Sequence, residues 1–148
     1  MTMEQRSVWV QVFVYPIALL VYLAVVGARA SAAPVSEISW VVPMIWTIGV
    51  MIIAIILGTI ATAIAAAAGA EIRGEKAEFE DGDIRDQEIE RYGDYRARHF
   101  TALGALAVIV LAMAHVDHFW IATSMFVTGT IAAEYGCIIR IRAYRQGL

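Results

Sequence analysis

One carboxylate lies well inside an apolar run near the C-terminal end of the chain. Glu134 belongs to the apolar stretch of residues 119–139. A charge is costly to bury in hydrocarbon, so an ionisable residue in such a stretch is a candidate for function, as a proton carrier or a cation ligand. The alternative is a purely structural role, because Glu134 lies only about 9 Å along a helix from Arg140. It would then reach the membrane interface or pair with Arg73, Arg96 or Arg98.

Other polar residues fall into two stripes. Helical geometry places four residues of the run 119–139 on one stripe: Thr123, Thr130, Glu134 and Cys137. Three residues of the first apolar run share a face in the same way: Gln11, Tyr15 and Tyr22. We expect both stripes to lie against other helices, with a ligand-facing surface as the alternative for the second. The single cysteine cannot form an internal disulfide and is expected to be a buried, inert thiol.

The short segment between the last two apolar runs contains His115, Asp117 and His118. Imidazole and carboxylate groups are zinc ligands, and a complete site would need a fourth ligand from Glu37 or from a second subunit. The alternative is that the histidines lie at the wet interface of the membrane without a metal. Buried histidines at complementary depths, which a haem or quinone site needs, are absent from the sequence, so no cofactor is expected.

Residues 71–98 form a charged segment between the second and third apolar runs. It contains ten carboxylates and six Lys or Arg residues, which gives a net charge of 6 − 10 = −4. Asp81-Gly82 indicates a turn, and Asp83 is a candidate N-cap of a helix that continues through Arg98 into the third run. We therefore expect two helical extensions joined by this turn. Helical spacings predict the ion pairs Glu88–Arg91 and Asp94–Arg98.

The charged segment has two interpretations. It is either a solvated helical face or a docking surface for a cationic protein. The residues expected to contact such a partner are Asp83, Arg85, Asp86, Glu88 and Glu90. The acidic balance argues against nucleic acid, which needs a basic surface, and against a basic patch that binds lipid.

Four apolar runs predict the elements that carry these side chains. The chain has 148 residues and is 60% hydrophobic, above the roughly 45–50% of soluble domains. The runs cover residues 8–27, 40–68, 101–114 and 119–139. About 20 apolar residues cross a bilayer as a helix, and lipid leaves no partner for an open strand. We expect an all-α fold, in which a single domain (1–148) forms an antiparallel bundle of four transmembrane helices and associates as a homo-oligomer, such as a homodimer.

The basic residues predict the orientation of this bundle. Ten of the eleven Lys and Arg residues fall on one side, and Arg29 alone falls on the other. Positive charge near span ends stays in the cytoplasm, so both termini and the charged segment are expected inside a bacterial inner membrane. The first run, with Arg6 before it and Ala30-Ser31-Ala32 after it, also resembles a secretory signal. Its apolar length of about 20 residues exceeds the usual 7–15, which favours an uncleaved span.

The stretch DIRDQEIERYGDY, residues 83–95, resembles a widespread group of small bacterial four-span membrane proteins of unknown function. The group shares an Asp-Glu-Arg-Asp segment before a helix that enters a membrane span. Asp83, Arg85, Asp86 and Ile89 match it, whereas Ile84 stands where the group usually has Glu. The stretches HFWIATSMF and IIRIRAYRQG are also similar. Members are often encoded beside small helix-turn-helix regulators, so the resemblance implies a transcription factor as the partner.

These features favour a membrane protein that is not an enzyme. The sequence contains no nucleophile elbow, phosphate loop, metalloprotease helix or paired glycosidase carboxylates. The first hypothesis is a module whose charged segment docks a cytoplasmic protein such as a transcriptional regulator. The second is a small proton-coupled transporter or exporter that uses Glu134. The third is an immunity protein against a membrane-active peptide.

Overall fold

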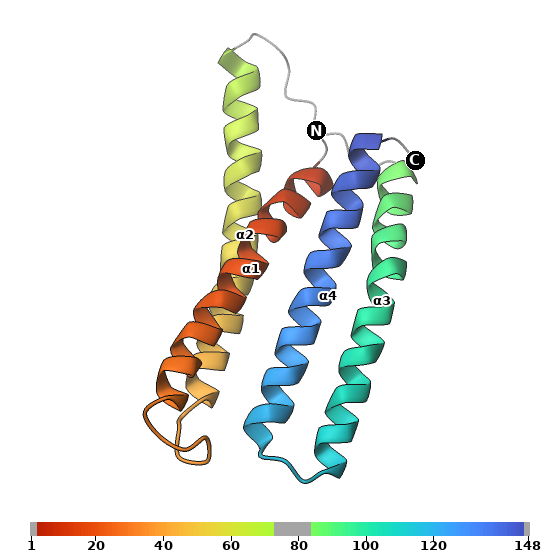
Figure 1. Ribbon diagram of the computed structural model, residues 1–148. Coiled ribbons are helices and arrows are strands. Elements are labelled where there is room, and N and C mark those ends of the chain that lie inside the picture. The colour runs from red at the N-terminus through yellow and green to blue at the C-terminus, as the bar shows by residue number, and fades with distance from the viewer. Residues whose placement is uncertain (1–2, 73–83, 147–148) are drawn as a thin grey trace.

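The computed structural model describes residues 3–72 and 84–146, which form four long helices (Figure 1). They are α1 (Met3–Ala30), α2 (Val41–Ile72), α3 (Ile84–Met113) and α4 (His118–Gln146). All four are long and apolar enough to cross a membrane. The predicted all-α fold with four spans is confirmed. The predicted turn at Asp81-Gly82 and the predicted N-cap Asp83 lie outside the described residues.

The helix α3 joins the charged segment to the third span. It is one continuous helix of 30 residues, so its length is about 45 Å. Its first half carries the acidic and basic residues that were predicted to extend the span, and its second half is apolar. The charged half is therefore a rigid continuation of a membrane helix from Ile84 onward.

The helices form an open antiparallel row rather than a closed square. The extensive contacts join α2 to α1, α1 to α4, and α4 to α3, so α2 and α3 are the outer members (Figure 1). The loops between α1 and α2 and between α3 and α4 lie together at one end, which we call the hairpin end. At the other end, which we call the charged end, α1 and α3 begin and α2 and α4 finish.

Small residues allow the helices to approach closely. At Gly93 of α3, an added Cβ would lie 3.1 Å from the backbone oxygen of Gly136 on α4. At Gly104, it would lie 2.7 Å from the Cβ of Thr128. On the other side of the row, a Cβ at Gly58 of α2 would lie 2.7 Å from a methyl group of Val10. Close backbone approach replaces the hydrophobic effect as a source of helix association in lipid.

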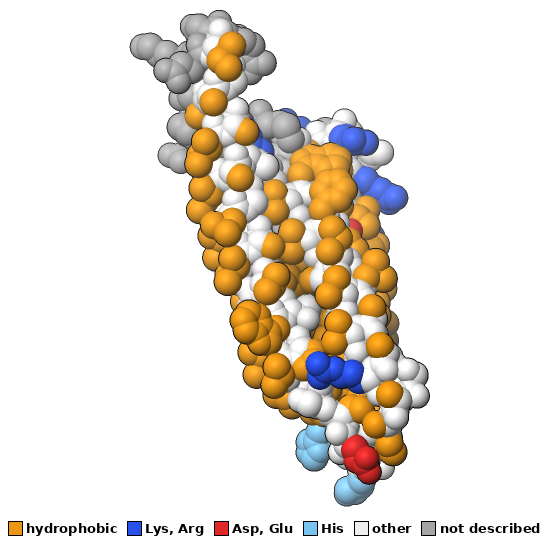
Figure 2. Space-filling model, turned by 90° about the vertical axis from the view of Figure 1, so that its left-hand side faces the viewer, with side chains coloured by type: hydrophobic (Ala, Val, Ile, Leu, Met, Phe, Trp, Pro, Cys, Tyr) orange, Lys and Arg blue, Asp and Glu red, His pale blue; other side chains and the backbone are white. Residues whose placement is uncertain are grey.

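One cluster of tightly packed apolar side chains lies at the hairpin end. Tyr22, Val26 and Phe119 are buried in one cluster, and five half-buried residues pack around it: Val35, Ile38, Trp40, Met44 and Phe126. Elsewhere, large apolar side chains face outward along all four helices. Figure 2 shows this apolar surface along the length of the molecule, with the Lys and Arg side chains gathered mainly toward one end. This distribution suits a surface that contacts lipid.

The contact at Gly104 generates a test of the packing. Gly104→Ala should destabilise the protein by about 1–3 kcal/mol, because the new methyl group overlaps the stiff, branched side chain of Thr128. Gly49→Ala is the matched control, since a Cβ at Gly49 meets nothing within 4 Å. Denaturant unfolding in detergent micelles measures both. An equal effect of the two substitutions would contradict the close contact between α3 and α4.

Candidate functional site

The two polar stripes meet between α1 and α4. The hydroxyl groups of Tyr22 and Thr123 share a hydrogen bond of 2.9 Å. Nearer the charged end, the thiol of Cys137 donates to the side-chain oxygen of Gln11 at 3.3 Å. We call the polar residues between the two helices the polar seam. It comprises Gln11, Tyr15 and Tyr22 of α1 with Thr123, Thr130, Glu134 and Cys137 of α4. Two residue sets far apart in sequence thus lie against each other.

Most of the polar groups in the seam are buried or half-buried and help to hold the bundle together. Tyr22 is only 1% exposed and Thr130 only 7%, and the hydroxyl of Thr130 donates to the carbonyl of Phe126 in its own helix. Thr123, Gln11 and Tyr15 are half-buried. Cys137 is buried as a free thiol. Apart from Tyr15, these groups form hydrogen bonds with one another, with neighbouring side chains or with the backbone, as buried polar groups usually do.

Glu134 is the exception in the seam. It is half-buried, and its Oε2 atom is buried without a hydrogen-bond partner among the described residues. It does not form the ion pairs considered for it within that part of the chain. The guanidinium of Arg96 lies over the ring of Tyr92 and donates to its hydroxyl at 2.9 Å, and no contact joins Glu134 to Arg98. The predicted partner Arg73 lies outside the described residues.

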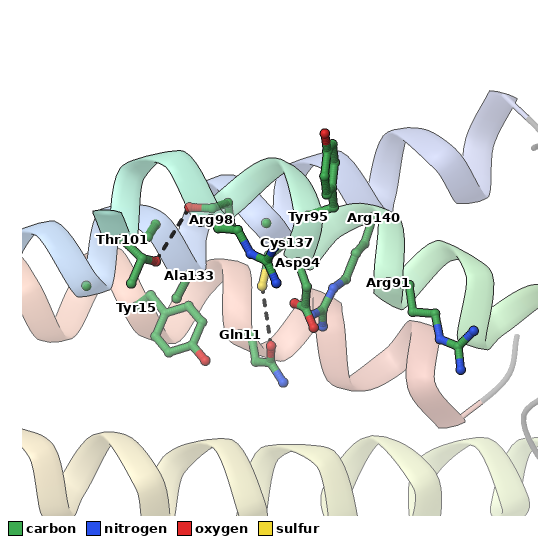
Figure 3. Close-up of a pocket in the computed structure, with 14 residues that line it drawn as sticks. Gln11, Tyr15, Arg91, Asp94, Tyr95, Arg98, Thr101, Ala133, Cys137 and Arg140 are labelled. Atoms are coloured by element: carbon green, nitrogen blue, oxygen red, sulfur yellow. Dashed lines mark hydrogen bonds and ion pairs between the residues drawn. The ribbon is translucent and has the colours of Figure 1, made fainter. Parts of the chain in front are cut away.

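A groove of about 860 Å³ opens beside the seam at the charged end. Gln11 and Tyr15 form its α1 side. The α4 floor consists largely of small side chains: Gly129, Ala132, Ala133 and Gly136. Polar side chains of α3 form the remaining wall: Arg91, Asp94, Tyr95, Arg98 and Thr101. Figure 3 shows the labelled side chains of the groove. Glu134 does not line this groove.

An interhelical ion pair closes one part of the groove. Arg140 of α4 donates to the carboxylate of Asp94 on α3, and its second nitrogen lies 4.0 Å from Glu90. The predicted pair Asp94–Arg98 is therefore wrong, because Asp94 reaches across to α4 instead. Gly93 makes room for this arrangement, since a Cβ there would lie 2.6 Å from the side chain of Arg140. The sequence analysis did not identify Arg140 as the partner of Asp94. Gly93 and Gly136, which allow α3 and α4 to approach closely, were the available signal.

The predicted docking residues divide into three groups. Asp83 lies outside the described residues. Arg85, Glu88 and Glu90 are exposed. Asp86 is only 6% exposed, so its assignment to the docking surface is wrong. It shares a face with Ile89, which is fully buried, because residues three apart lie on one side of a helix. This face of α3 turns toward the interior.

In the loop between α3 and α4, His115 and Asp117 have structural roles. His115 has a φ of 53°. The NH groups of His115 and Val116 donate to the carbonyls of Ala112 and Leu111, which is the Schellman arrangement that ends a helix. The Asp117 carboxylate accepts from the NH of Phe119 at 2.9 Å and caps α4. In the described ranges, no group of three or more His, Cys, Asp or Glu side chains is placed to hold a metal, which argues against the predicted zinc set.

The Tyr22–Thr123 bond generates a test of the seam. Tyr22→Phe and Thr123→Val should each lower stability, and their double-mutant cycle should give a coupling of about 0.6 kcal/mol, the average for such bonds in membrane proteins. Tyr95→Phe is the control, because Tyr95 is 62% exposed. Stability in detergent measures all variants. Strict additivity of the two seam substitutions would show that the hydroxyl groups do not interact.

Comparison with known proteins leaves the site to be interpreted from its own geometry. No family model, curated protein or solved structure matches this chain. The helices themselves establish the coarse class, a multi-pass membrane protein with four candidate spans.

Proposed function

We propose that this chain is a non-catalytic membrane protein that presents the charged half of α3 to a soluble protein. The observation that carries the proposal is that this half of α3 is fixed in place by packing and by an ion pair to α4. Ile89 is fully buried, Gly93 contacts the backbone of Gly136 on α4, and Asp94 pairs with Arg140. A helix held at three successive points is a preorganised surface, and preorganisation lowers the entropic cost of binding.

The acidic residues of the charged segment determine the type of partner. Glu88 and Glu90 are exposed on α3, where residues 84–98 carry four carboxylates and four arginines. The acidic excess of the segment comes from residues 71–83, which carry six carboxylates and two basic residues. Opposite potentials favour association and select the partner, so a protein with a basic surface is the best fit. A helix-turn-helix regulator, as the resemblance implies, has such a surface. The distribution of the positive charge supports a cytoplasmic location for this end of the molecule, where a regulator would be found.

Glu88→Lys tests the docking proposal most cleanly, because Glu88 is exposed, whereas Asp86 is buried and Glu90 lies near Arg140. Partner recovery by affinity purification from cells should fall roughly fivefold, as expected for one exposed ion pair reversed. The matched control is Glu4→Lys, an exposed acidic residue in the first turn of α1 at the same end. Equal recovery with both variants would contradict docking at this face.

A second function is favoured by one observation, the unpaired buried Oε2 of Glu134. A carboxylate without a partner between two membrane helices can exchange a proton for a cation during transport. In this alternative, the chain is a small proton-coupled exporter of lipophilic cations. The groove beside the polar seam at the charged end would then change shape as Glu134 takes up and releases its proton.

Glu134→Gln distinguishes this second function from the first. Cells that produce the wild-type protein should accumulate less ethidium than cells without it, and Glu134→Gln should abolish the difference because the amide cannot exchange a proton. Glu37→Gln, in the loop before α2, is the control for loss of one carboxylate. Equal ethidium efflux by Glu134→Gln and wild type would exclude a transport role for this residue.

A further inference from the structure

Two arginines of the charged-end groove have no partner within the described residues. Arg140 pairs with Asp94, whereas no hydrogen bond or ion pair engages Arg91 or Arg98. Both are exposed, and both line the groove. Figure 3 shows Arg91 farther toward the charged end than Arg98. The lining therefore presents two guanidinium groups that are not neutralised by the protein.

The depth of these arginines matches the headgroup layer of a bilayer. From Arg98, α3 has 15 uncharged residues before it ends at Met113, which is about 22 Å of helix. The hydrocarbon core is about 30 Å thick, so the backbone of Arg98 lies just inside its edge, and the long side chain can extend to the headgroup layer. Arg91 is seven residues earlier, which places it about 33 Å along the helix from Met113. This depth falls in the headgroup layer, which adds about 5–7 Å to each side of the core.

The floor of the groove suits an acyl chain. Gly129 and Ala133 line it on the hydrocarbon side of Arg140, and Gly129 lies 11 residues before Arg140, about 16 Å along the helix. Nothing lies within 4 Å of where a Cβ of Gly129 would be. The groove is thus basic at the headgroup level, and below it has an open floor of small residues flanked by Tyr15 and Thr101.

Taken together, the charge, depth and shape identify one occupant. We propose that the groove between α1, α3 and α4 binds an anionic phospholipid, with its phosphate at Arg91 and Arg98 and an acyl chain along Gly129 and Ala133. A guanidinium donates two parallel hydrogen bonds to phosphate oxygens. Although residues 71–98 are acidic overall, the groove itself is lined by three arginines and one aspartate. The local charge is therefore opposite to that of the segment.

A second groove provides an internal comparison. It lies between α1 and α2, has a volume of about 570 Å³ and is lined mainly by apolar side chains. Its one cation, Arg29, already donates to the carbonyl of Ser39. This groove offers hydrocarbon contacts without a free guanidinium, so it should not distinguish lipids by charge. Any preference for anionic lipid is then assigned to the groove beside α3.

Native mass spectrometry of the purified full-length protein tests the proposal. The protein in mild detergent is titrated with phosphatidylglycerol and, separately, with phosphatidylcholine. We expect wild type to retain phosphatidylglycerol more strongly. The double variant Arg91→Gln/Arg98→Gln should bind it roughly twentyfold more weakly, from about fivefold for each cation near a membrane surface. Arg142→Gln is the control, because Arg142 is exposed at the same end but does not line the groove.

A second variant tests the acyl-chain half of the proposal. Gly129→Leu fills the floor while both arginines remain, and it should also weaken retention of phosphatidylglycerol. Equal retention by the double variant and by Arg142→Gln would overturn the proposal. Displacement of the lipid by millimolar inorganic phosphate would overturn it in favour of a soluble anion. A change in the proportion of dimer caused by the double variant, without a change in lipid retention, would instead make a second copy the occupant.

Discussion

The close contact of α3 with α4 at Gly93 and Gly136 determines the geometry of the charged end. Because neither residue has a side chain, the two backbones approach until a Cβ at Gly93 would lie only 3.1 Å from the Gly136 carbonyl oxygen. Arg140 then lies directly beside Gly93 and reaches Asp94. Ile89, one turn before Gly93 on the same face of α3, is fully buried. The groove, the exposed face of α3 and the free arginines all follow from this one crossing.

The central position of α4 separates two environments. One side of α4 meets α1 through hydrogen-bonded polar groups, from Tyr22 and Thr123 near the hairpin end to Gln11 and Cys137 near the charged end. The other side meets α3 through small residues. Lipid supplies little driving force for helix association, so packing and interhelical hydrogen bonds must provide it. The α1 side relies more on hydrogen-bonded polar groups and the α3 side on close packing, with the Arg140–Asp94 pair added at the charged end. Glu134 belongs to the polar side without being paired there.

The four helices and the two polar stripes could be predicted from the sequence, because both depend on the spacing of residues close together in the chain. The prediction that Gln11, Tyr15 and Tyr22 share a face required only the period of a helix. The lateral order of the helices is not local, so the pairing of Asp94 with Arg140 rather than Arg98 could not be deduced. Asp86 is an intermediate case. Its spacing from Ile89 and Gly93 marks a packed face, but its charge suggested a solvated one.

The outer helices of the row differ greatly in apolar length. The uncharged part of α2 begins at Val41 and continues to Gly69, about 43 Å of helix, whereas that of α3 is about half as long. A bilayer adjusts its thickness to the hydrophobic surface beside it. Lipid next to α3 must therefore be compressed relative to lipid next to α2. The molecule would impose a gradient of bilayer thickness across its own width, and neighbouring proteins with short spans would be favoured on the α3 side.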